Sequence, residues 1–211
     1  MKCVHIYTLF LMFVFCTSCL GQNTPGLPKE KMRYETNDYE YTDVIGKRLF
    51  IQNSYPKGVE KYTDPNGKVW VIATFWTRIS NETDNPLALK IDFPVDSFEL
   101  PSSPGHYFKL FLPSDTMTRE KEHLYNYGLP VLKSFLDKGL QKASSLKRTI
   151  NPEESSAFYV VTLFNQGLEG IVRTELSLKG QNLIYKINGK EISCGKINLK
   201  KLKLKKALAK K

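Results

Sequence analysis

The chain has 211 residues, of which 41% are hydrophobic and 25% charged, and its formal net charge at pH 7 is +10. Nine of these ten net charges come from Lys2 and from eight lysines of an acid-free C-terminal stretch: Lys196, Lys200, Lys201, Lys203, Lys205, Lys206, Lys210 and Lys211. The body between them is nearly neutral, so the charge distribution excludes a nucleic-acid-binding domain.

Residues 1–18 are predicted to be a signal peptide. Lys2 is followed by an apolar run from about Tyr7 to Phe15 that contains no acid. A helix needs about 20 apolar residues to span a bilayer, so this run is too short to cross one, and its length suits the apolar region of an export signal.

The four residues from Cys16 to Cys19, Cys-Thr-Ser-Cys, resemble the lipobox of bacterial lipoproteins, although Cys16 stands where leucine is commonest. The resemblance implies that Cys19 becomes the N-terminus and carries a lipid anchor on its sulfur. Leu20 then favours the outer membrane, because an inner-membrane retention signal commonly has Asp there. Two alternatives stay open, namely ordinary cleavage after Ser18 or Gly21 and an uncleaved anchor.

The remaining cysteine, Cys194, has no partner for an internal disulfide once the signal is removed. No histidine or metal-spaced ligand lies near it in the sequence. It is therefore predicted to be a small buried hydrophobe near a strand end and not a reactive thiol.

The rest of the chain is divided into three parts. Residues 19–31 are predicted to be a tether, because the polar segment Asn23 to Lys31 within them has two prolines and a glycine. Residues 32–199 are long enough for one sizeable core and are predicted to form a single domain. Residues 200–211 form a basic tail.

The segment Tyr34 to Asp43 is acidic and aromatic. Tyrosines at positions 39 and 41 alternate as in a half-buried strand, which predicts an edge strand. The functional alternative is that Tyr34, Tyr39 and Tyr41 stack on sugars while the acids Asp38, Glu40 and Asp43 bind calcium.

Two segments are apolar on both faces and are predicted to be central strands: Lys68 to Trp76 and Ser156 to Phe164. The first follows the turn Asp64 to Gly67, where Asn66 and Gly67 can take positive φ, and pairs with Glu60 to Thr63. Further strands are predicted at Leu87 to Phe93, His106 to Leu112, Ile171 to Leu178, Leu183 to Ile187 and Lys190 to Ser193, with a last strand through Ile197 and Leu199.

One helical insertion, from about residue 115 to 145, interrupts the strands. Leu132, Phe135, Leu136 and Leu140 keep a spacing of one helix face, which predicts a helix from about Pro130 to Ala143. A shorter helical piece is predicted around Arg119 to Tyr125.

Two segments carry a family resemblance. Thr77 to Pro94 and Leu146 to Phe164 resemble strand–turn–strand units of immunoglobulin-like domains in exported bacterial lipoproteins. The predicted fold is therefore all-β, an immunoglobulin-like antiparallel β-sandwich with one helical insertion. The resemblance implies binding or scaffolding and carries over no individual residue.

No motif predicts catalysis, a metal or a cofactor. There is no phosphate-binding loop or dinucleotide fingerprint, and neither His106 nor His123 has a second ligand at metal spacing. The lysines Lys200, Lys201, Lys203, Lys205 and Lys206 are either a solubilising end or a contact for anionic lipid or another polyanion.

The sequence as a whole predicts a non-catalytic binding or assembly module of the bacterial cell envelope, tethered by lipid on Cys19. It does not name the ligand, for which an envelope protein or a glycan is a candidate. Two alternatives stay open. One is a hydrolase of envelope polymers that uses His106 or His123 as base, and the other is a secreted protein whose lysine tail binds anionic lipid.

Overall fold

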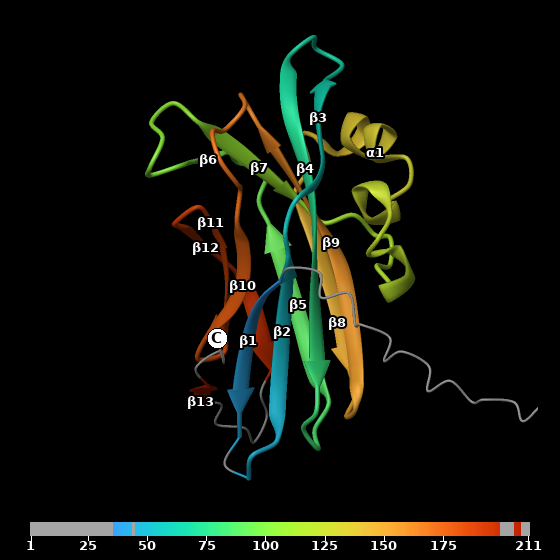
Figure 1. The fold of residues 1–211 in the computed structure, drawn as a ribbon, viewed down its shortest axis with the longest axis vertical. Coiled ribbons are helices and arrows are strands. Elements are labelled where there is room, and N and C mark those ends of the chain that lie inside the picture. The colour runs from blue at the N-terminus through green and yellow to red at the C-terminus, as the bar shows by residue number, and fades with distance from the viewer. Residues whose placement is uncertain (1–35, 44, 199–204, 208–211) are drawn as a thin grey trace, which may run out of the picture. The chain divides into compact units, whose positions relative to one another are not determined.

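The computed structural model describes residues 36–43, 45–198 and 205–207, and these form thirteen strands, one α-helix and two short 3-10 helices (Figure 1). The strands are β1 (Thr36–Thr42), β2 (Arg48–Ser54), β3 (Lys57–Thr63), β4 (Val69–Asn81), β5 (Leu87–Phe93), β6 (Phe98–Glu99), β7 (Tyr107–Phe111), β8 (Ser144–Ile150), β9 (Glu154–Phe164), β10 (Thr174–Lys179), β11 (Asn182–Ile187), β12 (Lys190–Asn198) and β13 (Lys205–Ala207). The helices are η1 (Arg119–Lys121), η2 (Tyr125–Gly128) and α1 (Leu132–Gly139).

The strands form two antiparallel sheets. The first has the order β13-β1-β2-β4-β9-β7-β6, with β3 also paired to β4, and the second has the order β10-β11-β12-β5-β8. Strands β2 and β3 follow each other in the chain and pair with successive halves of β4, through Asn53 opposite Thr77 and Tyr62 opposite Trp70. The long strand β4 is therefore paired along both sides, since β9 runs beside it from Asn81 to Val71.

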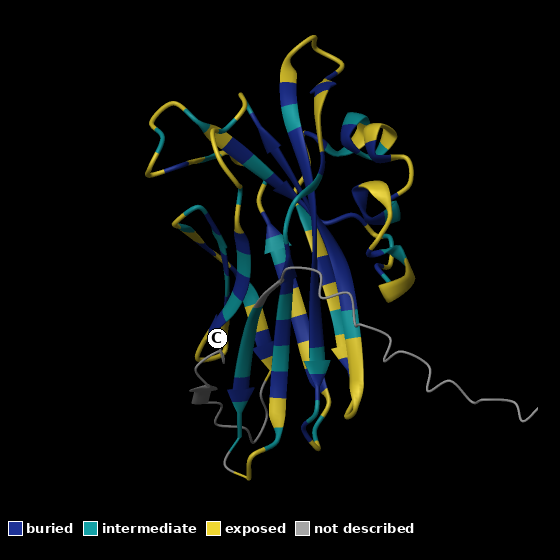
Figure 2. Cartoon of the chain, viewed as in Figure 1, coloured by how far each residue is buried: buried dark blue, intermediate teal, exposed yellow. Residues whose placement is uncertain are grey.

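The two sheets share one hydrophobic core. Along β5, Leu87, Leu89, Ile91 and Phe93 are 0–2% exposed, whereas the residues between them are exposed or half-buried (Figure 2). These side chains pack in one cluster with Phe75 and other inward residues of the first sheet. The predicted one-sided strand is thus confirmed.

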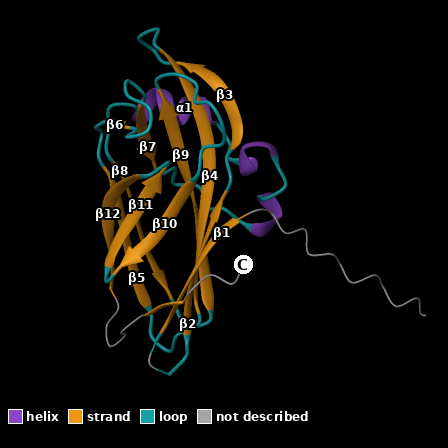
Figure 3. Ribbon diagram, turned by 60° about the vertical axis from the view of Figure 1, so that its left-hand side comes forward, coloured by secondary structure: helices purple, strands orange, loops and turns teal. Residues whose placement is uncertain are grey.

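A second core lies on the other face of the first sheet. Trp76 and Tyr159 of the sheet are buried there with Leu132, Leu136 and other residues of the insertion. Figure 3 shows the helices on the face of β4 and β9 that is turned away from β10 to β12. Both faces of β4 and β9 are buried, which confirms that the two-sided apolar runs are central strands.

The insertion itself is less helical than predicted. Helix α1 begins at Leu132, because Val131 takes a left-handed φ of 42°, and it ends at Gly139. Of the predicted shorter piece, Arg119–Lys121 and Tyr125, the first residue of η2, are helical. The chain follows the sheet surface here, and the hydroxyl of Tyr127 donates to the Tyr55 carbonyl at 2.6 Å.

The acidic and aromatic N-terminal segment forms β1. The predicted edge position is wrong for Glu40 to Thr42, because β13 pairs with the outer side of β1 there. Tyr39 donates a hydrogen bond to Glu175 of β10, and the Tyr41 hydroxyl accepts one from the Leu178 N–H at 2.7 Å. The two hydroxyls therefore link the first sheet to β10, which accounts for these tyrosines without a sugar ligand. Tyr34 lies outside the described residues.

The all-β class, the antiparallel sheets and the helical insertion are as predicted. The immunoglobulin-like assignment stays a prediction, because two packed sheets are common to many strand orders. The predicted signal peptide and tether lie outside the described residues. In the part of the chain that the structure describes, no helix has the length and apolar character needed to cross a membrane.

Candidate functional site

The lipid-anchor residue, Cys19, lies outside the described residues, and so do Lys200, Lys201 and Lys203 of the basic tail. The structure places the backbone of Lys205 and Lys206 in β13, opposite Thr42 and Tyr41 of β1. That part of the tail is a strand and does not run freely beyond β12.

The two candidate histidines lie on different elements. His106 is half-buried in the turn between β6 and β7, and its buried Nδ1 has no hydrogen-bond partner, whereas His123 is exposed in the insertion. Neither lines either of the depressions described below. Within the described residues, no three side chains of His, Cys, Asp or Glu come together as a metal site.

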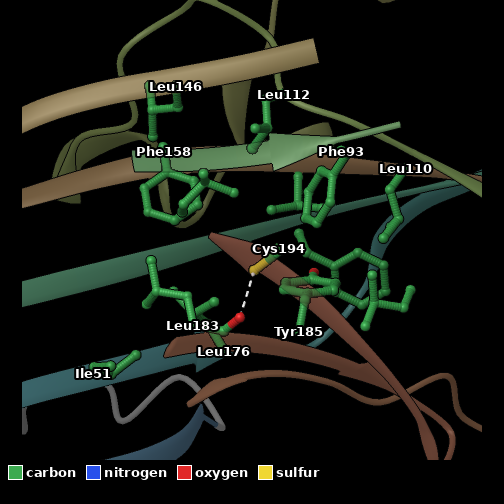
Figure 4. Packing of buried hydrophobic residues seen from close by; sticks show 14 of the residues in the cluster. Ile51, Phe93, Leu110, Leu112, Leu146, Phe158, Leu176, Leu183, Tyr185 and Cys194 are labelled. Carbon is green, nitrogen blue, oxygen red and sulfur yellow. Dashed lines mark hydrogen bonds between the residues drawn. The ribbon is translucent and has the colours of Figure 1, made fainter. Parts of the chain in front are cut away.

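Cys194 is buried in the core between the sheets, as predicted (Figure 4). Its thiol donates a hydrogen bond to the Leu183 carbonyl at 3.4 Å. Burial raises the pKa of the thiol to about 12, so at neutral pH the group is a protonated, unreactive filler.

The strand that holds Cys194 contains a bulge. Strict alternation along β12 would turn Ile192, Cys194 and Lys196 to one side, yet Ile197 is buried and Lys196 is exposed. The register with β11 shifts at this point, so that Ser193 lies opposite Ile184 and Gly195 opposite Leu183. The bulge therefore reverses the alternation and turns Lys196 outward.

This reversal aligns three lysines on the exposed face of the second sheet. Lys196 of β12 lies directly opposite Lys90 of β5, and Lys90 lies directly opposite Lys147 of β8. All three are exposed, and neighbouring strands are about 4.8 Å apart. We call these three residues the lysine row.

The charges of the lysine row are only partly balanced. The ammonium group of Lys90 lies 2.9 Å from a carboxylate oxygen of Asp92, a solvent-exposed pair. Among the described residues, no carboxylate lies within 4.0 Å of the ammonium group of Lys147 or Lys196. The row is thus a line of positive charge across three strands.

A shallow depression of about 300 Å³ adjoins the row between β5 and β8. Its lining comprises Ala88, Leu89, Lys90, Lys147, Arg148 and Thr149. Ala88 and Thr149 lie opposite each other, two residues from the Lys90 and Lys147 pair. Because their side chains are short, the surface is hollowed at this point. The arrangement offers the ammonium groups of Lys90 and Lys147 beside a space that can admit an anionic group.

A second depression, of about 400 Å³, lies where the insertion meets the first sheet and is lined by Arg78, Met117, Thr118, Arg119, Ser155 and neighbouring residues. The Arg78 side chain is 7% exposed and donates to Glu122 at 2.6 Å, and its guanidinium lies over the Trp76 ring at 4.8 Å. Because these contacts already occupy Arg78, we interpret it as an anchor of the insertion and not as a ligand site.

Comparison of the chain with protein-family models, with curated proteins and with solved structures found no match. The lysine row was not among the residues that the sequence indicated. It depends on the register of three strands from distant parts of the chain. The one local signal is Gly195, since an isolated glycine inside a strand pattern indicates a bulge.

Proposed function

We propose that the protein is a non-catalytic binding module of the bacterial cell envelope, held at the outer membrane by lipid on Cys19. The resemblance of residues 16–19 to a lipobox supports the tether. The observation that carries the binding role is the lysine row, which lies on the exposed face of the second sheet.

The row is unfavourable for folding, which supports a role in binding. Like charges directly opposite each other on a sheet face destabilise it. Lys196 also reaches this face only through a bulge at Gly195, whose φ of 148° is unusual for any other residue. The row thus lowers stability both through charge repulsion and through the bulge that it requires, and such a cost is typical of a functional surface.

The immunoglobulin-like classification belongs to the same proposal. The two antiparallel sheets that share one core support it, but an immunoglobulin domain has about seven to nine strands, fewer than the thirteen described here. A common sandwich core with added strands and the insertion is the form we propose.

Metabolic labelling with palmitate tests the tether. Wild type is expected to take up label and to fractionate with membranes, Cys19→Ala to lose both properties, and Cys16→Ala to keep the label. Label retained in Cys19→Ala, or an acyl-free mature chain that begins beyond residue 19, would contradict the tether.

A further inference from the structure

We infer that the lysine row binds a linear anionic polymer, a carboxylate- or phosphate-bearing glycan of the envelope, which lies across the strands of the second sheet. The inference rests on the proposed role as a binding module and names its ligand class and site. Lys196, Lys90 and Lys147 follow one another on β12, β5 and β8.

The geometry of the row suits a repeating ligand. Hydrogen-bonded strands hold the three Cα atoms in line, about 4.8 Å from one to the next. A chain that carries an anion on every unit can meet all three ammonium groups at once, whereas a single small anion meets one or two. The depression beside Ala88 and Thr149 gives such a chain a place on the face.

The rest of the face disfavours a membrane. Acids lie on the same side of the sheet. Asp92 pairs with Lys90 of the row, and Glu175 and Glu191 lie farther along the face, where they pair with Lys186 and Lys179. A flat anionic bilayer would also press against the paired charges of β10 to β12, whereas a narrow polymer would contact only the row and Asp92. No large exposed hydrophobic side chain on β5, β8 or β12 is available to enter a bilayer.

The face also disfavours nucleic acid. Bases of single strands are held by exposed aromatic side chains, and Phe93 and Tyr185 of this sheet point into the core. Recognition here rests on charge and spacing. A polymer with carboxylates or phosphates and no need for stacking therefore fits best.

The test uses the full chain purified in detergent and polygalacturonate as the probe. The row variant is Lys90→Gln/Lys147→Gln/Lys196→Gln. The matched control is Lys61→Gln/Lys138→Gln/Lys142→Gln, which removes the same charge from exposed lysines of β3, α1 and the turn after α1. All variants keep the basic tail, so that any binding by the tail is common to them.

We expect wild type to bind polygalacturonate and the row variant to bind it about tenfold or more weakly at low salt, with the control close to wild type. The dependence of log affinity on log salt should become shallower by up to about one unit for each row lysine removed. Monomeric galacturonate should bind far more weakly than the polymer.

Several results would overturn the inference. One is equal weakening in the row variant and the control, and another is no binding of either polygalacturonate or long-chain polyphosphate. Tighter row-dependent binding to phosphatidylglycerol vesicles would identify a membrane surface instead, and tighter binding to single-stranded DNA would identify nucleic acid. Palmitate labelling of Cys19 is independent of these outcomes, so failure of the site and failure of the tether are distinguished.

Discussion

Gly195 of β12 lies against the backbone of Lys90 on β5, so close that a Cβ atom on Gly195 would stand 2.0 Å from the Lys90 carbonyl oxygen. Its φ of 148° adds a second reason why a side chain is excluded. The contact fixes the bulge, and the bulge sets the direction of Lys196. One glycine therefore determines whether Lys196 joins Lys90 and Lys147 in the lysine row.

Replacing this glycine is expected to damage both the fold and the row. Gly195→Ala should lower the free energy of unfolding by about 3 kcal/mol or more, because either the backbone of β12 or that of β5 must move. Urea unfolding measures the loss. Gly167→Ala is the control, since its Cβ would meet nothing within 4 Å, and it should lie within about 0.5 kcal/mol of wild type. A small effect at Gly195 would mean that the strands do not approach as described.

The like charges of the row should be measurable as a loss of stability. Lys147→Gln removes one of them from an exposed position opposite Lys90, and we expect the free energy of unfolding to rise by about 0.2–1 kcal/mol at low salt. The gain should shrink at high salt, because screening already weakens the repulsion in wild type. A loss of stability that is independent of salt would show that Lys147 has a packing role.

The sequence predicts those features of the fold that depend on the pattern of residues within one continuous segment of the chain. The sequence predicts the two-sided runs of β4 and β9 because apolar residues occupy both alternating faces, and a strand of that kind must be covered on both faces. The spacing of Leu132, Phe135, Leu136 and Leu140 predicts the helix, although its start at Leu132 depends on the backbone of Val131.

The sequence alone does not predict the bulge or the lysine row, for a physical reason. The sequence predicts two segments, Lys190 to Ser193 and a last strand through Ile197 and Leu199. The structure has one strand, Lys190–Asn198, in which the bulge at Cys194 and Gly195 changes the phase of the alternation. The register between β12, β5 and β8 then determines which lysines lie opposite one another. No single-strand pattern contains that information.

The buried pair Arg78 and Glu122 should be essential to the attachment of the insertion. Its side chains are 7% and 12% exposed, so Glu122→Gln would leave the Arg78 charge buried without its partner. We expect a loss of about 3 kcal/mol, measured by urea unfolding. The exposed pair of Arg48 and Glu82 is the control, and Glu82→Gln should cost about 1 kcal/mol or less.

The same site allows a stricter test with a double variant. Arg78→Met/Glu122→Leu removes both charges together and should regain most of the stability lost in Glu122→Gln, because no isolated charge stays buried. If the double variant is less stable than the single one, the pair contributes through its geometry and the contact of Arg78 with Trp76 instead.

The turn between β3 and β4 should make stability depend on pH at the acid end. The Asp64 carboxylate accepts hydrogen bonds from Trp70 Nε1 at 3.0 Å and from the N–H groups of Asn66 and Lys68 at 2.9 and 3.0 Å. These bonds, that of Trp70 foremost, hold the pKa of Asp64 below its ordinary value of 3.8. Of the two turn residues that the sequence marks for a positive φ, Gly67 takes one, of 83°, and Asn66 does not. The turn is stabilised instead by the hydrogen bonds that the Asp64 carboxylate accepts.

Because the folded pKa of Asp64 is the lower one, its contribution to stability is complete above pH 3.8 and is lost as pH falls through the folded value. Asp64→Asn keeps one acceptor but presents an amide to the Trp70 N–H, so it should be less stable than wild type by about 2 kcal/mol near neutral pH. The urea midpoints of wild type and Asp64→Asn should differ at about pH 6 and lie closer together at about pH 2.5, since only wild type has the acid-sensitive contribution. A difference that stays constant between the two pH values would show that the carboxylate is not charged in the folded protein.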